Sequence, residues 1–319
     1  MKAAARAVVA AGLTGYLLWR SHPRDVLAAL AGADWRLIAI AVLLVFVDRA
    51  LMAYRWVVLL CIVDPAERPP FVEVMRIFFV STFVGTFLPA SIGGDAVRAY
   101  SMAQLNVRGS DAVASVFMDR MLGVASILVM AAVGLTRARD LAGNVTIMLS
   151  LAVAASACVV TLALIFSEGA ARIMTALLAG MPVSVRHSGD RVIESIRRYA
   201  AYHGQLTSVL VGSILVQILR IVQAYFLGRS LAIAMPLPAY FAFIPLILLV
   251  MLLPVTINGI GTSQAAFVWF FGRAGVPAAS AFTLSVLFVA LGVVGNLPGG
   301  LLYAFGKHGA VRQDSTPAL

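Results

Sequence analysis

Several ionisable side chains interrupt stretches of the sequence that are otherwise apolar. An ionised group near the centre of a bilayer costs about 2.5–3.5 kcal/mol to insert, so such residues normally face a bundle interior or a wet cavity. Guanidinium groups in that setting suit anion recognition, because their planar fork of donors matches the oxygens of a phosphate. The residues are Asp48, Arg49 and Arg55 within 35–63, Asp119 and Arg120 within 111–136, and Gln217, Arg220 and Gln223 within 206–230.

Helical spacing gathers these residues onto two stripes. Asp48 and Arg55 lie on one stripe of a helix, and Gln217, Arg220 and Gln223 lie on another. We expect both stripes to line one interior.

Charge pairing within the bundle is the alternative interpretation of the carboxylates. Asp48 can pair with Arg55, Asp119 can pair with an arginine of a neighbouring helix, and Asp95 with Arg98 can cap a helix that follows residue 94. Buried charges are normally paired, which favours this interpretation for each carboxylate. Arginines nevertheless outnumber acids in these blocks, so about two positive charges still need an anion or water. A lipid phosphate is a natural partner for them.

The composition excludes an ordinary water-soluble enzyme. Of the 319 residues, 61% are apolar and only 12% are charged, and the mean hydropathy is +0.97. Typical soluble domains carry about a quarter of charged residues, so lipid must be the solvent for much of this chain. The net charge of +10 is spread thinly between apolar blocks, which argues against a nucleic-acid partner and is typical of basic cytoplasmic loops.

Eight apolar blocks predict an all-α, polytopic transmembrane bundle that forms one integral membrane domain over residues 1–319. A crossing needs about 20 residues, and no block shows the alternation of a membrane barrel. The polar stretch 167–205 has apolar residues at helical spacing, which predicts an amphipathic helix at the interface. The blocks are 3–19, 35–63, 71–89, 111–136, 141–166, 206–230, 238–254 and 277–304.

Two of the blocks end in the same unusual way. Residues 88–94 read Leu-Pro-Ala-Ser-Ile-Gly-Gly, and residues 253–259 read Leu-Pro-Val-Thr-Ile-Asn-Gly, 165 positions later. Proline removes a backbone donor and the glycine-containing pair permits a sharp turn, so both helices should break here. Short helical patterns follow at 95–104 and 263–272. Broken segments at corresponding positions of two halves, here about 35–136 and 206–304, indicate a transporter-like site made of discontinuous helices.

The distribution of basic residues favours two re-entrant hairpins over eight full crossings. If 71–104 and 238–272 each enter and leave on one side, with the N-terminus inside, 13 basic residues lie inside and 7 outside. Eight crossings with the same orientation give 8 inside and 11 outside, which breaks the positive-inside rule. The hairpin arrangement also inserts the two hairpins from opposite sides, as an inverted repeat requires. A reversed eight-span arrangement, with 11 inside and 8 outside, remains an alternative.

Motifs of the familiar catalytic and cofactor sites are missing. The sequence has no Walker loop, no nucleophile elbow, no His/Cys metal spacing and no dinucleotide fingerprint. We therefore expect no enzyme activity, no metal and no cofactor. The same absence argues against a third interpretation, an integral enzyme that modifies lipids.

The amino-acid sequence around the first break resembles that of a known family. Residues 87–98 follow the pattern F-L-P-x-x-x-G-G-D-x-x-R, and Arg55-Trp56, the run from Ala114 to Arg120 and the second break agree in spacing. Together they are similar to the lysylphosphatidylglycerol synthase transmembrane-region family of flippase-like bacterial and archaeal membrane proteins. The resemblance implies a multi-pass domain of the bacterial cytoplasmic membrane that moves a lipid between leaflets. Short relatives of this size include one found with hopanoid-lipid biosynthesis.

One position departs from that family's pattern. Where the family commonly has an Arg-Glu pair after the second break, this chain has Ser263-Gln264. A role for that charge pair is therefore not carried over.

These observations lead to a lipid flippase or scramblase as the expected function, with a polar-headed membrane lipid as partner. The alternative is a membrane scaffold for lipid-synthesis enzymes that transports nothing. Asp48 and Arg49 are expected to balance charge or couple to protons. The expected headgroup-binding residues are Arg55, Gly93, Gly94, Asp95, Arg98, Asp119, Arg120, Arg220, Asn258 and Gly259.

Overall fold

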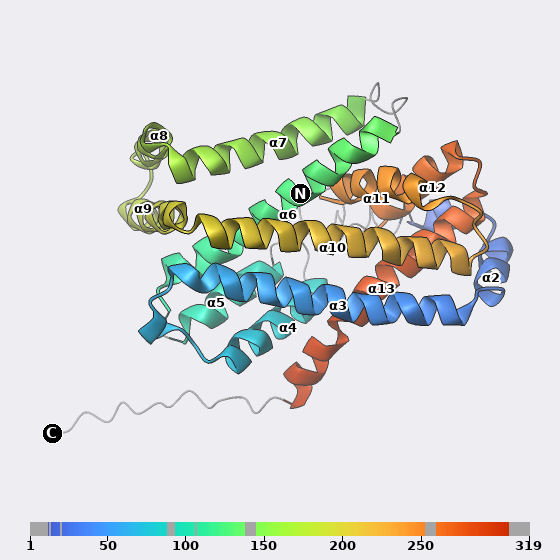
Figure 1. Ribbon diagram of the computed structural model, residues 1–319, viewed down its shortest axis with the longest axis horizontal. Helices are drawn as coiled ribbons and strands as arrows, with labels where there is room; N and C mark the ends of the chain where they lie inside the picture. The colour runs from blue at the N-terminus through green and yellow to red at the C-terminus, as the bar shows by residue number, and fades with distance from the viewer. Residues whose placement is uncertain are drawn as a thin grey trace.

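The computed structural model is a helical bundle (Figure 1). It describes residue 12 and the ranges 14–19, 21–87, 93–105, 107–137, 145–252 and 260–305, and within these no strand occurs. The helices are α2 (Pro23–Ala31), α3 (Trp35–Leu59), α4 (Phe71–Phe87), α5 (Gly93–Ala103), α6 (Gly109–Arg137), α7 (Val145–Phe166), α8 (Glu168–Leu178), α9 (Val183–Arg198), α10 (His203–Ser230), α11 (Leu237–Met251), α12 (Thr262–Arg273) and α13 (Ala278–Phe305), with short 3-10 turns at Leu60–Ile62, Pro65–Glu67 and Tyr199–Ala201.

Four helices of the described residues are long and apolar enough to cross a membrane. They cover Trp35–Ile62, Gly109–Thr136, His203–Ser230 and Ala278–Phe305, and α7 with α8, bent by 103°, adds a fifth if the pair is one span. Each corresponds to a predicted apolar block. The block 3–19 lies largely outside the described residues.

The two blocks in which proline breaks are predicted form shorter helices. α4 has 17 residues and α11 has 15, which at 1.5 Å per residue gives roughly 22–25 Å, less than a hydrocarbon core of about 30 Å. α5 and α12 begin where the short helical patterns were expected. The prolines and the turns themselves, at 88–92 and 253–259, lie outside the described residues.

Each short helix packs side by side with the helix that follows it. In α4 and α5, Gly85 meets Gly94 while Ser81 meets Arg98, so the two helices are antiparallel. In α11 and α12, Tyr240 meets Phe271 and the helices are again in contact. The two helical hairpins, α4–α5 and α11–α12, lie in opposite halves of the bundle (Figure 1).

The most extensive contact between two helices is that of the antiparallel pair α3 and α10. The amide of Asp34 donates to Ser230 at one end, and the side chain of Arg55 packs on Gly212 toward the other. Asp34 also caps α3 by accepting from the amide of Arg36. α4 packs against α13, and α11 packs against α6, so each hairpin leans on a long helix of the other half.

Two glycines make those contacts between halves close. A Cβ at Gly134 in α6 would lie 2.9 Å from the carbonyl oxygens of Phe241 and Ala242 in α11. A Cβ at Gly299 in α13 would lie 1.9 Å from the carbonyl oxygen of Phe79 in α4. Small residues permit such backbone approach between membrane helices, and these two glycines are themselves 165 positions apart.

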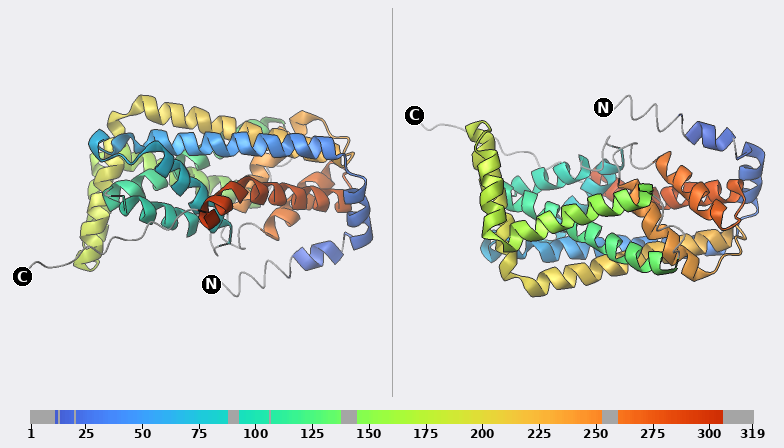
Figure 2. Two further views of the ribbon diagram at one scale, coloured as in Figure 1. Left: turned by 90° about the horizontal axis from the view of Figure 1, so that it is seen from below. Right: turned by 90° about the horizontal axis from the view of Figure 1, so that it is seen from above.

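The segment 167–205 forms two helices rather than the single amphipathic helix that we predicted. Pro182 cannot continue a helix from α8, and it caps the start of α9 instead. α8 and α9 lie across one end of the bundle, and α2 crosses the other (Figure 2). The predicted apolar stripe on α9 is correct, since Ile193 and Ile196 are buried.

A cluster of polar contacts attaches α9 to that end. Asp111 of α6 accepts a hydrogen bond from Ser195 over 2.7 Å and forms an ion pair with Arg198, which also donates to the carbonyl of Ile62. Burial raises the pKa of the Tyr199 phenol well above its ordinary value, so the hydroxyl stays protonated and donates to the carbonyl of Leu59 over 2.7 Å.

Candidate functional site

A polar cavity of about 310 Å³ lies at mid-length of the bundle, beside α4 and α5. Its lining comes from α3, α4, α5, α6, α10 and α13. Nearly all of the ionisable residues singled out in the sequence reach it. The charged lining residues among those described are Arg49, Arg55, Asp95, Arg98, Asp119, Arg120 and Arg220.

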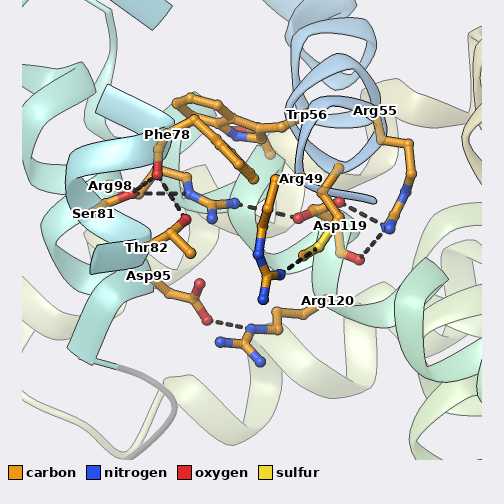
Figure 3. A network of polar contacts seen from close by, with 12 residues as sticks. Arg49, Arg55, Trp56, Phe78, Ser81, Thr82, Asp95, Arg98, Asp119 and Arg120 are labelled. Atoms are coloured by element: carbon orange, nitrogen blue, oxygen red, sulfur yellow. Dashed lines mark hydrogen bonds and ion pairs between the residues drawn. The ribbon is translucent and has the colours of Figure 1, made fainter. Parts of the chain in front are cut away.

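Asp119 is the centre of the charge network (Figure 3). One carboxylate oxygen accepts from Arg55 over 2.8 Å, and the other accepts from Arg98 over 3.3 Å. This single residue of α6 therefore joins α3 to α5. All three side chains are at most 10% exposed, so each charge depends on the others for its partner.

Arg98 is held in an aromatic cradle. Its guanidinium carbon lies 5.0 Å from the ring centre of Trp56 and 4.7 Å from that of Phe78 (Figure 3). Both distances are within the range of cation–π attraction. Trp56 is fixed in turn by an indole hydrogen bond to Ser115. The guanidinium is thus oriented by the fold before any ligand arrives.

Arg120 and Asp95 form an ion pair at the outer edge of the cavity. The Arg120 side chain is 43% exposed and that of Asp95 is 15% exposed. The charges thus run from an accessible pair at the edge to the buried Arg98–Asp119–Arg55 group.

A second group of charges lies between α3 and α10. Asp48 is 3.4 Å from Arg49 and 3.6 Å from Arg220. Arg49 and Arg220 both also donate to the sulfur of Met52. These contacts are long or weak compared with a close charge-assisted hydrogen bond of about 2.7–2.9 Å, so this group is less tightly paired than Asp119.

The balance of charge in the described site is positive. Five arginines face three aspartates, which leaves two positive charges in excess. Several buried polar atoms in the same region also have no hydrogen-bond partner in the described part of the chain: Asp48 Oδ1, Arg49 Nε, Arg55 Nε, Gln217 Oε1, Gln223 Nε2 and Asn296 Oδ1. Buried polar groups are normally satisfied, so the arrangement fits an anionic, hydrogen-bonding occupant together with water.

Two of the predicted ion pairs are wrong. Asp48 pairs with Arg49 and Arg220 instead of Arg55, because residues seven apart on a helix are separated by about 10 Å along the axis. Asp95 pairs with Arg120 instead of Arg98, which turns toward Asp119. The prediction that Asp119 pairs with an arginine of a neighbouring helix is correct.

The structure describes only two of the four backbone-turn residues that were predicted to bind the headgroup, Gly93 and Gly94. Gly94 lines the cavity and lies against Gly85, while Gly93 begins α5 and is half-buried. Asn258 and Gly259 lie outside the described residues.

Some lining residues were missed in the sequence. Asn296 carries a signal, because it is an amide inside the long apolar helix α13; it donates to Thr86 over 2.8 Å. Ser81 and Thr82 of α4 look like ordinary small polar residues of a membrane helix, and no pattern in the sequence singles out Phe78.

The chain matches the family model described as "Lysylphosphatidylglycerol synthase TM region" over residues 3–299. No curated protein matches the chain at a similarity that indicates a relative. The family match covers both hairpins, the long helices up to residue 299 and every residue that lines the cavity. The chain therefore belongs to the lysylphosphatidylglycerol synthase transmembrane-region family, as its sequence motifs indicated, and is a lipid-related integral membrane protein.

Proposed function

We propose that the protein moves an anionic lipid headgroup between the two leaflets of a membrane, as a flippase or scramblase. The observation that carries the proposal is the excess of arginine over aspartate in a cavity at mid-length of an apolar bundle. Positive charge in that position is costly unless an anion or water accompanies it. A phosphate suits it best, because each guanidinium offers paired donors.

The proposed path of the headgroup follows the decrease in exposure of the charged side chains from the edge of the cavity to its interior. A phosphate first meets Arg120, the most exposed charge of the site, and then Arg98, which is oriented by its aromatic cradle. Asp95 and Asp119 hold these arginines while no ligand is bound. The headgroup would cross through the cavity while the acyl chains stay in the surrounding lipid.

The two helical hairpins are proposed to be re-entrant and to insert from opposite sides of the membrane. Support comes from their short helices, from their places in opposite halves of the bundle, and from the reciprocal packing of α4 on α13 and α11 on α6. The 165-residue offset that relates the breaks also relates Gly134 to Gly299 and Arg55 to Arg220. We propose that two inverted repeats, about 35–136 and 206–304, form one membrane domain, with α8 and α9 at the interface.

The proposal assigns no catalytic chemistry to the chain and places it in the bacterial cytoplasmic membrane. The sequence contains no nucleotide-binding loop, so transport would run down a lipid gradient or use an ion gradient. Asp48 and Arg49 are then the residues proposed for charge balance or coupling.

Reconstitution tests the proposal directly. Purified protein is placed in liposomes with a fluorescent phosphatidylglycerol, and a membrane-impermeant reductant reports how fast the inner-leaflet lipid becomes accessible. We expect wild-type protein to accelerate exchange, and Arg98→Gln and Arg120→Gln to slow it at least tenfold. Arg172→Gln is the matched control, because that side chain is 82% exposed on α8.

Two results would count against the proposal. Normal rates in both cavity variants would remove the role of these arginines, provided that the variants elute and melt like wild type. If wild-type protein leaves the lipid asymmetry unchanged, the alternative of a non-transporting scaffold for lipid-synthesis enzymes is favoured.

A further inference from the structure

An apolar groove of about 830 Å³ lies where α8 and α9 cross one end of the bundle (Figure 2). α6 and α7 form one wall of the groove, and α8 and α9 form the other. It shares no lining residue with the polar cavity of the candidate site. Phe117, Leu164 and Ile196 are among its apolar lining residues, and among the described residues that line it only Ser184 and Ser188 have polar side chains.

The groove lies at the depth where the acyl chains of a membrane begin. Val113 is near the start of α6 and Val160 is near the end of α7, and at 1.5 Å per residue they lie about 6 Å and about 9 Å from those helix ends. Amphipathic helices at a membrane interface bury their apolar faces by about 5–10 Å. With α8 and α9 at the interface, as proposed above, the groove therefore meets the outer part of the hydrocarbon layer.

The groove is open toward the surroundings of the bundle. Val113, Val160 and Val185 line it, yet they are 43%, 50% and 45% exposed. On the outer side of α8, Ile173 and Leu177 are 65% and 67% exposed. Apolar side chains on both sides of one helix fit a lipid environment, so a lipid chain can enter the groove from the side.

Positive charge lies at the polar edge of the groove, on the first half of α9. Ser184 and Ser188 share one stripe of this helix with Arg191. In the part of the chain that the structure describes, Arg191 has no ion pair, and its Nε donates to a main-chain carbonyl oxygen of α9. Arg186 lies 4.0 Å from Asp190. One positive charge is therefore in excess along this edge.

The acidic residues of α8 and α9 line a different cavity. Glu168, Asp190 and Glu194 lie between the start of α8 and the end of α9, together with Arg172 and Arg197. The charges are mixed there, but positive beside the apolar groove. Lipid tails are as apolar as leucine, so the groove alone does not distinguish one lipid from another. The excess charge at its edge does, because it attracts an anionic headgroup.

We propose that this groove holds one acyl chain of an anionic phospholipid whose phosphate lies beside Ser184, Ser188 and Arg191. The lipid is a resident component that joins α8 and α9 to α6 and α7, and it is distinct from a lipid that the polar cavity would carry. The inference does not rest on transport, because it concerns another site and its test measures binding.

Photochemical labelling in liposomes tests this inference. Two probes carry the same diazirine-bearing acyl chain, one as phosphatidylmethanol with one negative charge and the other as phosphatidylcholine with no net charge, and mass spectrometry identifies the labelled peptides. We expect groove peptides to take up the anionic probe about fivefold more than the zwitterionic probe, the effect of one basic residue near the headgroups. Peptides with the exposed residues Val211 and Leu215 of α10 should show no preference.

One substitution fills the groove and another removes the charge. Val160→Trp should lower labelling of the groove to the level of α10, and Val159→Trp is the matched control, because that neighbouring side chain is 64% exposed and does not line the groove. Arg191→Gln should abolish the preference for the anionic probe and keep the labelling by the zwitterionic probe. Arg24→Gln removes an exposed charge on α2, at the other end of the bundle, and should change nothing. If Val160→Trp does not fold, Val113→Trp fills the groove from α6.

Three results would overturn the proposal. Equal labelling of the groove by the two probes would indicate an ordinary lipid-facing surface. Labelling no stronger than that of α10 would leave the groove without a bound chain, and elution of the protein as a dimer would then indicate that a second copy covers it. A preference that Arg191→Gln leaves unchanged would remove the phosphate from this edge. None of these results bears on whether the protein transports lipid.

Discussion

The two helical hairpins share a backbone plan but differ in what fills them. The α4–α5 hairpin presents Ser81, Thr82, Asp95 and Arg98 to the cavity. The α11–α12 hairpin is filled by rings, with close contacts that join Tyr240, Phe243, Phe267, Phe270 and Phe271. In its described residues the only charged side chain is Arg273, which stacks on Trp269 at the end of α12.

The difference shows how one motif can serve two roles. Aromatic pairs contribute about 0.5–1.5 kcal/mol each beyond their burial, so the second hairpin is held by packing that needs no ligand. The first hairpin is held partly by charges whose partners a phosphate can replace. We infer that the α4–α5 hairpin recognises the headgroup and that the α11–α12 hairpin supports it.

The difference between the two hairpins is largest at one pair of positions related by the repeat offset. Arg98 in α5 and Ser263 in α12 are 165 positions apart, the offset of the two breaks. Arg98 has Asp119 as a partner. Ser263 is completely buried and its hydroxyl donates to Gln264, and neither α11, α12 nor α13 carries an acidic residue.

Ser263→Arg should therefore have the largest effect of the substitutions considered. It adds bulk to a packed site and buries a charge with no acid on the helices around it, which together should lower the free energy of unfolding by more than about 4 kcal/mol. Titration with a denaturing detergent, followed by helix content, measures the change. Ser188→Arg on the exposed face of α9 should cost less than about 0.5 kcal/mol.

A stable Ser263→Arg variant would contradict the comparison. It would mean that position 263 reaches the cavity or water, so that both hairpins can hold a charge.

The sequence predicts the helices well, and the physical reason is local. Periods of apolar residues set α3, α6, α10 and α13, and α4 and α11 end next to the segments in which the breaks are predicted, which lie outside the described residues. The stripes on α3 and α10 do face one region, because the helical repeat alone determines which residues share a face.

The choice of partners in the site could not be predicted in the same way. Arg98 has Asp95 one turn away, yet it pairs with Asp119, because α5 packs against α6 and the aromatic cradle directs the guanidinium there. Gln223 of α10 and Asn296 of α13 line one further cavity of about 270 Å³ although they lie on different helices. Contacts of this kind depend on how helices approach each other, which residue spacing within one helix does not specify.

Removing the carboxylate at the centre of the network should have the next largest effect. Asp119→Asn leaves Arg55 and Arg98 buried without a counter-charge, although the amide oxygen can still accept one hydrogen bond. We expect a loss of about 3 kcal/mol in the free energy of unfolding in detergent.

Asp95→Asn is the comparison for this measurement. Its partner Arg120 is 43% exposed, so water can solvate the guanidinium, and the loss should stay below about 1 kcal/mol. Equal losses in the two variants would show that the charges of the first hairpin do not differ in importance with depth.

The smallest of the three expected losses in the free energy of unfolding, after those of Ser263→Arg and Asp119→Asn, concerns the close approach of α4 and α5. A Cβ at Gly94 would lie 2.8 Å from the carbonyl oxygen of Ser81 and 3.0 Å from the Cα of Gly85, all of them backbone atoms that a rotamer change cannot move. Gly94→Ala should therefore separate the two helices and lower the free energy of unfolding by about 2 kcal/mol. Gly204→Ala in α10 is the control, because nothing lies within 4 Å of the added carbon and alanine favours the helix. If Gly94→Ala matched that control, the first hairpin would tolerate separation, and the geometry that places Arg98 against Asp119 would not depend on the glycine contact.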